Sequence, residues 1–298
     1  MAKGNMFQGR ARGSVGDVTF QVLKGQQISK ARNRQPANPR TTKQMTQRSL
    51  FVDAVKFYTR GTQNLFKFAF EGKKQTESDF NAFMRVNAKL GVNLSPEAFN
   101  DFTYPALGNW IMTQGSLALN NNFEWLESSD FFALRGDVFT GSALGNIGEA
   151  SRVVMANSGA MIGDIVTVVF IRAVNSVDSN TPAVYPESRG PVNWSIWQFR
   201  VDPASTEALP SGLSTQVVIN RMALTIDAES DVDICAATLV VSRNTSAGLK
   251  VSTSFLVGNK MATDAIAAAK DESYIGQVVS AWKATGDAIL QGSLSEPE

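Results

Sequence analysis

The chain has 298 residues, of which 43% are hydrophobic and 18% are charged, so its composition is that of a folded protein rather than a disordered one. It contains no histidine and a single cysteine, which excludes an intrachain disulfide and every catalytic or metal site built on histidine. The longest apolar runs, 165–171 and 234–241, are far shorter than the roughly 20 residues of a membrane-spanning helix, so we expect no membrane insertion.

The N-terminus has no apolar segment of the kind that a secretory signal requires, so we expect the mature chain to begin near Met1. The one cysteine, Cys235, lies in an apolar run, which predicts a buried and unreactive thiol. Both features fit a protein that is made in a reducing cytoplasm.

Charge is distributed unevenly along the chain. The first 50 residues hold ten lysines and arginines but a single acid, Asp17, whereas residues 51–298 hold 18 basic and 26 acidic residues. A basic segment of this kind is typical of contact with polyanions, because each neutralised phosphate releases condensed counterions. The same charges could instead pair with the acidic part of a neighbouring subunit. The candidate nucleic-acid-binding residues are Lys3, Arg10, Arg12, Lys24, Lys30, Arg32, Arg34, Arg40, Lys43 and Arg48.

The first 40 residues are predicted to form a basic hairpin and an extended arm. Side-chain character alternates on both sides of Lys24-Gly25, which predicts strands over 17–23 and 26–32. Pro36 and Pro39 then favour extended backbone in the residues before them. We therefore expect the extended segment that follows the hairpin to lie along a partner rather than to fold on itself.

Helical spacing of apolar residues begins at Thr41 and predicts one helix over 41–60 and a second over 76–91. Thr76 and Asp79 have the spacing of a capping box at the start of the second helix, and Gly91 marks its end. We expect a helical segment over 41–95 whose phenylalanine and methionine stripes pack in the core or in a subunit interface.

After Pro96 the sequence is rich in β-branched and aromatic residues that are interrupted by glycine, proline and asparagine. One helix is predicted near 146–157, and one or two more from Met261. The predicted strands are 109–119, 131–139, 164–174, 193–201, 215–226, 233–243 and 249–257.

The last two predicted strands form a long hairpin, which we expect to be the central pair of the sheet. The predicted class is α+β, with a mainly antiparallel β-sandwich or jelly-roll-like body over 96–260. Residues 261–298 are predicted to form a C-terminal helix and an acidic tail.

Other patterns have an ordinary structural explanation, which we favour. The glycines of 9–16 and 141–148 lack the Lys-Ser/Thr of a phosphate loop. Four acids alternate along one loop and could bind calcium, but acidic turns between strands are common; they are Asp227, Glu229, Asp231 and Asp233. Trp197 and Phe199 share a strand face and, with Trp194, could stack on bases or glycans, but core packing is the more common use. We expect no metal, no cofactor and no small-molecule substrate.

An Arg-x-Pro-x-x-Pro-x-Thr-x-x-Gln pattern follows the glycine-rich hairpin. It consists of Arg34, Pro36, Pro39, Thr41 and Gln44, and Arg48 lies just behind it. With this pattern, residues 4–55 resemble the N-terminal block of an uncharacterised family of gut bacterial and gut phage proteins, and residues 239–257 resemble its closing hairpin. The resemblance implies a small phage or virus-like structural protein, in which the prolines form an extended strap, the threonine caps a helix and the arginine anchors it.

These features predict a virion structural protein, with the coat protein of a small bacteriophage as the first candidate. It would self-assemble as a homo-oligomer in the host cytoplasm, reside in the virion, and contact packaged nucleic acid or neighbouring subunits through its basic arm. The alternative is a non-viral bacterial β-sandwich protein for binding or assembly, whose arm contacts a protein. An enzyme is not expected.

Overall fold

A computed structural model of the chain divides it into two compact units, residues 1–41 and 42–298. The predicted segments 96–260 and 261–298, and all but the first residue of 41–95, belong to the second unit. The structure describes residues 12–23, 26–32, 40–59, 69–74, 76–93, 110–118, 123–126, 131–135, 145–173, 192–218, 221–227 and 234–292.

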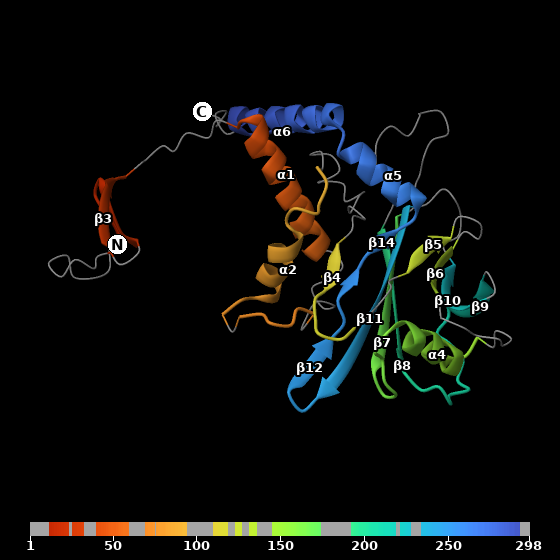
Figure 1. The fold of residues 1–298 in the computed structure, drawn as a ribbon. Helices are drawn as coiled ribbons and strands as arrows, with labels where there is room; N and C mark the ends of the chain where they lie inside the picture. Colours follow the sequence, from red (N-terminus) through yellow and green to blue (C-terminus); the bar gives the residue numbers. More distant parts are fainter. Residues whose placement is uncertain are drawn as a thin grey trace. The chain divides into compact units, whose positions relative to one another are not determined.

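The first unit contains a three-stranded antiparallel sheet, drawn in red in Figure 1. Its strands, in spatial order, are β1 (Gly13–Val15), β2 (Val18–Leu23) and β3 (Gln26–Ala31). The predicted hairpin is confirmed at β2 and β3, but β1 was not predicted, because three residues are too few to show an alternating pattern. Gly16 has φ +52, and this left-handed conformation allows the tight turn that returns the chain from β1 to β2.

The second unit is built around a five-stranded antiparallel sheet. The order β12–β11–β7–β8 makes β11 and β7 the central pair, so the prediction that the β11–β12 hairpin is central is wrong. The bounds are β7 (Ile165–Ala173), β8 (Val192–Arg200), β11 (Ile234–Thr245), β12 (Gly248–Val251) and β14 (Val257–Gly258), the last of which pairs with β11.

A second, four-stranded sheet has the order β5–β6–β10–β9. The single strand predicted over 215–226 is wrong, because β9 and β10 are two strands that pair with each other from Val218↔Arg221 to Leu213↔Ile226. Residues 136–139 of another predicted strand lie outside the described residues. The bounds are β5 (Glu124–Leu126), β6 (Phe131–Arg135), β9 (Leu213–Val218) and β10 (Arg221–Asp227).

Two further predicted strands are shorter in the structure. The described part of the first, residues 110–118, contains the single named strand β4 (Ile111–Thr113), and 249–257 break into β12, β13 (Ser254–Phe255) and the start of β14. β13 pairs with β4 rather than with the five-stranded sheet.

The helices are found where they were predicted, with different ends. The second helix is capped by Ser78, whose side chain accepts a hydrogen bond from the Asn81 amide, so the predicted cap at Thr76 is wrong. Asn146 caps α4 in the same way, accepting from the Glu149 amide at 2.9 Å. The bounds are α1 (Thr42–Phe57), α2 (Asp79–Asn87), α4 (Ile147–Asn157), α5 (Lys260–Ala269) and α6 (Glu272–Gly292). Among the described residues, no helix combines the length and hydropathy that a bilayer crossing requires.

Two hydrophobic cores lie on opposite faces of the five-stranded sheet (Figure 1). Side chains alternate between the two faces along a strand, so β7 contributes to both cores. Val168 and Phe170 pack in the core with residues of β6, β10 and α4. Val169 and Ile171 pack in the other core, with residues of α1, α2 and α5. The second unit therefore has a helical layer, a central sheet and a second sheet. This arrangement confirms an α+β fold with a sandwich-like body.

Candidate nucleic-acid interface

Six of the ten predicted phosphate-binding residues are described, and they divide between the two units. Lys3, Arg10, Lys24 and Arg34 lie outside the described residues. In the first unit are Arg12, Lys30, Arg32 and Arg40, and on α1 in the second are Lys43 and Arg48.

One face of the N-terminal sheet gathers three of these cations. Ser14 Oγ and Thr19 Oγ1 lie 3.0 Å apart, and Thr19 is directly opposite Lys30, so the three residues share a face. Alternation along the strands extends the set in both directions. We call this the cationic face, and its members are Arg12, Ser14, Thr19, Gln21, Ile28, Lys30 and Arg32.

The cationic face is open to solvent at its charged residues. Arg12, Lys30 and Arg32 are all exposed. The Arg32 amide donates to the Asp17 carbonyl at 2.6 Å, which extends the pairing of β2 and β3 by one step. The one acid of the first 50 residues therefore lies at the Arg32 end of the sheet, and Lys30 and Arg12 lie two and four residue pairs further from it.

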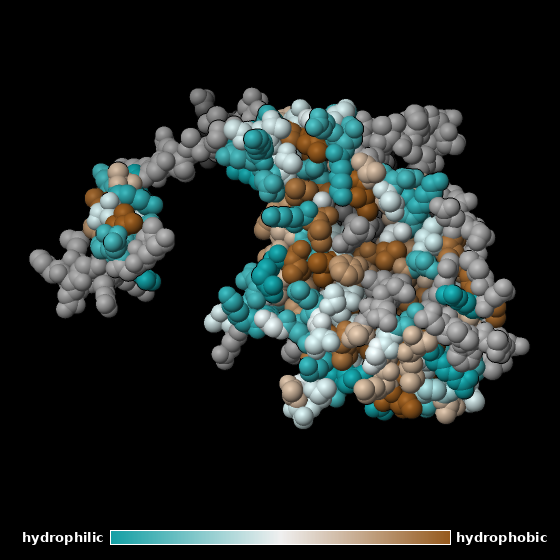
Figure 2. All heavy atoms as spheres, viewed as in Figure 1, coloured by the Kyte–Doolittle hydropathy of each residue, from teal (hydrophilic) through white to brown (hydrophobic). Residues whose placement is uncertain are grey.

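The opposite face of the same sheet is apolar. Val15 and Val18 are direct cross-strand partners there, and 58% and 39% of their surface is exposed. Figure 2 shows such apolar side chains at the surface of this small sheet, next to hydrophilic ones. We call this the apolar face, and its members are Val15, Val18, Phe20, Val22, Gln27, Ser29 and Ala31.

Sequence reasoning missed the apolar face. The signal that reveals it is the register of β1 on β2, which places a third valine beside those of β2. That register depends on the turn at Gly16. A count of charges contains no information about strand register, so it could not reveal the apolar face.

The cations of the second unit lie on the first turns of α1. Lys43 and Arg48 are exposed, and Arg48 Nη1 lies 3.9 Å from Met45 Sδ. Phe51, two helical turns after Lys43, is 51% exposed on the same side of the helix. Arg40, just before α1, has φ 46, a left-handed conformation that is unfavourable for a residue with a side chain.

The tryptophans of β8 are packing residues, as the sequence favoured. Phe199 is buried, and Trp197 packs on Phe170 with ring centres 6.4 Å apart. Trp194 points to the other core, 5.6 Å from the ring of Phe57. The three rings therefore do not form one stacking surface.

The predicted acidic loop falls largely outside the described residues, since only Asp227 is described. In the part of the chain that the structure describes, no three histidine, cysteine, aspartate or glutamate side chains lie close enough to hold a metal.

Gly148, in the second of the glycine-rich stretches, has a packing role, because a Cβ there would lie 2.5 Å from the Ser205 carbonyl oxygen.

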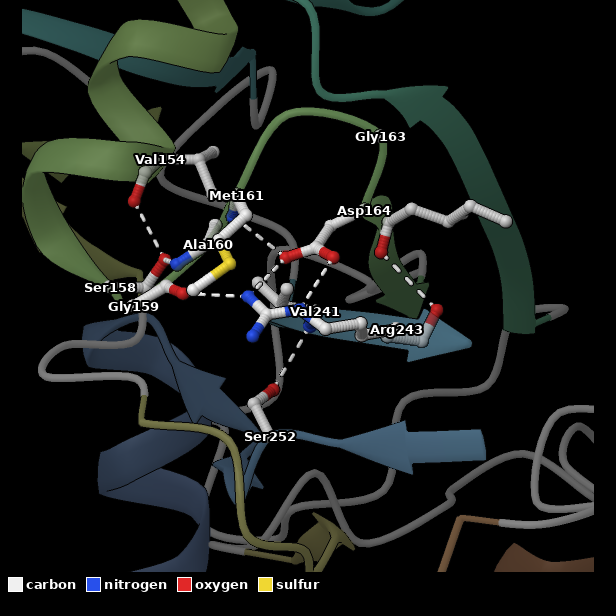
Figure 3. A network of polar contacts seen from close by, with 12 residues as sticks. Val154, Ser158, Gly159, Ala160, Met161, Gly163, Asp164, Val241, Arg243 and Ser252 are labelled. Atoms are coloured by element: carbon white, nitrogen blue, oxygen red, sulfur yellow. Dashed lines mark hydrogen bonds and ion pairs between the residues drawn. The ribbon is translucent and has the colours of Figure 1, made fainter. Parts of the chain in front are cut away.

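A partly buried ion pair joins the α4–β7 turn to β11 (Figure 3). Arg243 donates from Nε to Asp164 Oδ1 at 2.8 Å and from Nη2 to Oδ2 at 2.7 Å, and Nη2 also donates to the Gly159 carbonyl. The Met161 backbone amide donates a further hydrogen bond to Asp164 Oδ2 at 2.8 Å. Burial alone would raise the pKa of Asp164, but these hydrogen bonds and the charge of Arg243 outweigh it and lower the pKa. Arg243 is thus engaged in holding the fold.

Comparison with known proteins gives a family. Residues 9–186, more than half of the chain, match a family of unknown function, DUF6266. The chain belongs to that family. The DUF6266 match begins before the N-terminal sheet, includes both of its faces and the helices α1, α2 and α4, and ends after β7. No curated protein and no solved structure matches.

Proposed function

We propose that this DUF6266 protein is a structural protein of a virus particle, with the coat of a small bacteriophage as the first candidate. In this proposal it is no enzyme; it assembles with copies of itself in the host cytoplasm and remains in the virion. Its cationic face contacts the packaged nucleic acid. The observation that carries the proposal is that Arg12, Lys30 and Arg32 are exposed on one face of a sheet that forms its own unit.

The chemistry of the cationic face suits phosphates. Its side chains offer charged and neutral hydrogen-bond donors, and backbone phosphates accept from both. Flat contact by arginine, lysine and hydroxyl groups does not read base edges in a groove, so binding should tolerate any sequence. Each phosphate neutralised should add a slope of roughly 0.7 to 0.9 to the dependence of affinity on salt.

The distribution of charge between the units also supports a packaging role. The first unit carries eight lysines and arginines and one acid, whereas the second carries 20 basic and 26 acidic residues. A polyanion is therefore attracted to the first unit and repelled by the net charge of the second. Such a molecule can present one part to nucleic acid while its body remains in a protein layer.

The apolar face favours a second candidate. Exposed valines on a strand pair are typical of a protein contact rather than of a phosphate contact. A non-viral bacterial protein for binding or assembly, whose N-terminal sheet contacts a protein, would need only that face.

The proposal is tested by replacing the cations of the sheet in the full-length protein. We compare wild type with R12Q/K30Q/R32Q, and use K89Q/K260Q/K270Q as the control, because these three lysines are exposed in the second unit. Size-exclusion chromatography with light scattering and absorbance at two wavelengths gives particle mass and nucleic-acid content. Fluorescence anisotropy with single-stranded DNA and RNA gives the salt slope.

We expect particles of wild type and of the control that contain nucleic acid. The sheet variant should lose most of that nucleic acid, with a salt slope smaller by about 2 to 3. A wild-type protein that stays monomeric or dimeric and free of nucleic acid at low salt would contradict the proposal.

A further inference from the structure

Among the described residues of the first unit, no second layer packs on the apolar face of the N-terminal sheet. Three short strands form a single layer, and such a sheet is stable only when its hydrophobic face packs on something else. The face is most open at Val15 and Val18, which are direct cross-strand partners and 58% and 39% exposed. At the other end, Val22 and Gln27 are half-buried.

Charge indicates what can cover this face. Two N-terminal sheets that met face to face would bring together two units that each carry eight basic residues and one acid. The second unit, with 26 acids against 20 basic residues, has the opposite net charge and attracts the sheet. In a homo-oligomer, every neighbouring copy offers such a surface.

We propose that the apolar face docks on the second unit of a neighbouring copy while the cationic face stays open to phosphates. The nucleic-acid contact and the subunit contact, which the sequence presents as alternatives, are then made together by opposite sides of one sheet. The inference deepens the proposed function and rests on it for the role of the cationic face and for self-assembly.

Residues that are adjacent in sequence lie on opposite faces of the sheet, so the two proposed contacts can be changed separately. Ser14 and Val15 are neighbours in sequence but lie on opposite faces, and the same is true of Val18 and Thr19. A substitution on one face therefore leaves the side chains of the other in place. Threonine is the suitable replacement for valine, because it is also β-branched and keeps the strand propensity while adding a hydroxyl group.

The first test compares V15T/V18T with R12Q/K30Q/R32Q in the full-length chain. We expect V15T/V18T to raise the concentration at which assemblies dissociate by about tenfold or more, and to leave the affinity of the dissociated protein for single-stranded DNA within about twofold. R12Q/K30Q/R32Q should weaken DNA binding and leave assembly at high salt unchanged. If V15T/V18T leaves assembly unchanged, the docking proposal is wrong.

The second test identifies the occupant and does not depend on the stability of a variant. A photoreactive amino acid replaces Val15, and ¹⁴N-labelled and ¹⁵N-labelled chains are mixed, assembled and irradiated. We expect cross-linked peptides that join position 15 of one isotope to residues 42–298 of the other. Cross-links between chains of the same isotope only, cross-links between two N-terminal units, or no cross-links would each overturn the proposal.

The two proposals can fail separately. A protein that gives the expected mixed-isotope cross-links but binds no nucleic acid keeps the subunit contact and loses the packaging role. A protein that packages nucleic acid without these cross-links keeps the packaging role and loses the subunit contact.

Discussion

Asp164 is a residue whose charge the fold depends on. It is 4% exposed, and it accepts hydrogen bonds from Arg243 and from the Met161 amide, which lower its pKa. A lowered pKa stabilises the folded state at every pH above the ordinary value near 4, and this contribution disappears as the pH falls through the folded-state pKa.

The variant D164N should therefore be less stable than wild type by about 3 kcal/mol at neutral pH, because Arg243 keeps its charge in a partly buried site without its partner. The difference should shrink at pH values below the folded-state pKa of Asp164, where the wild-type carboxyl is protonated as well. Urea denaturation at neutral and acid pH measures both values.

D264N is the matched control for this prediction, since Asp264 is exposed on α5. Its stability should equal that of wild type at both pH values. An equal loss in D164N at neutral and acid pH would mean that shape rather than charge explains the role of Asp164.

Single residues were predictable from sequence only where their neighbours in the chain determine their environment. Cys235 lies in an apolar run, and the prediction that it is buried is confirmed. Asp164 and Arg243 are 79 positions apart, and no local pattern relates them. Their pairing follows from the register of β7 on β11, in which Ser242 lies opposite Ile165.

At the scale of elements, α2 is held to β4 by one side chain. Asn87 Nδ2 donates to the Ile111 carbonyl at 2.9 Å, and the Ile111 amide donates to Asn87 Oδ1 at 2.8 Å. The side-chain amide thus pairs with β4 as a neighbouring strand would.

We expect N87A to lower the free energy of unfolding by about 2 to 4 kcal/mol, because it leaves two backbone groups of Ile111 without their partner. N81A is the control, because Asn81 is exposed on the same helix. Thermal and urea unfolding of both variants measures the difference. A similar loss in both would mean that helix propensity rather than the contact with β4 is responsible.

Elements were predictable where the hydrophobic pattern is uninterrupted. β7 and β11 are apolar on both faces because each face lines a core, and their predicted bounds differ from the structure by no more than two residues. The pattern gave a wrong prediction where the chain reverses direction without a glycine or proline at the turn. β9 and β10 both contribute apolar side chains to the same core, and Ile219-Asn220 between them contains neither glycine nor proline, so the two strands resemble one.

At the scale of the whole molecule, the second unit should not need the first. Both large hydrophobic cores are made of residues from α1 onwards. A protein without residues 1–41 should therefore keep its near-ultraviolet circular dichroism, and its Tm should stay within about 3 °C of the full-length value.

A protein without residues 1–59 is the informative comparison, because it also lacks Ala54 and Phe57, which are fully buried in the helical core. We expect that protein to lose its fixed tertiary structure. A large drop in Tm on removal of 1–41 alone would contradict the independence of the second unit.

The molecular organisation was predictable in part. Counting charges located the basic segment within the first 50 residues, since charge depends on composition alone, and the change to helical spacing indicated a boundary near Thr41. It did not predict that the cations divide between the sheet and α1, or that the sheet has an apolar side. Those features depend on the pairing of β1 with β2 and on where α1 begins.

The position of β7 and β11 has a consequence for how the second unit comes apart. One layer of backbone separates the two cores, and the same strands line both. Neither core can open without removing a wall of the other, so the helical layer and the second sheet should melt in one cooperative transition. The helical segment, the β-rich body and the C-terminal helices look like separate blocks in the sequence, but we expect them to unfold as one thermodynamic unit.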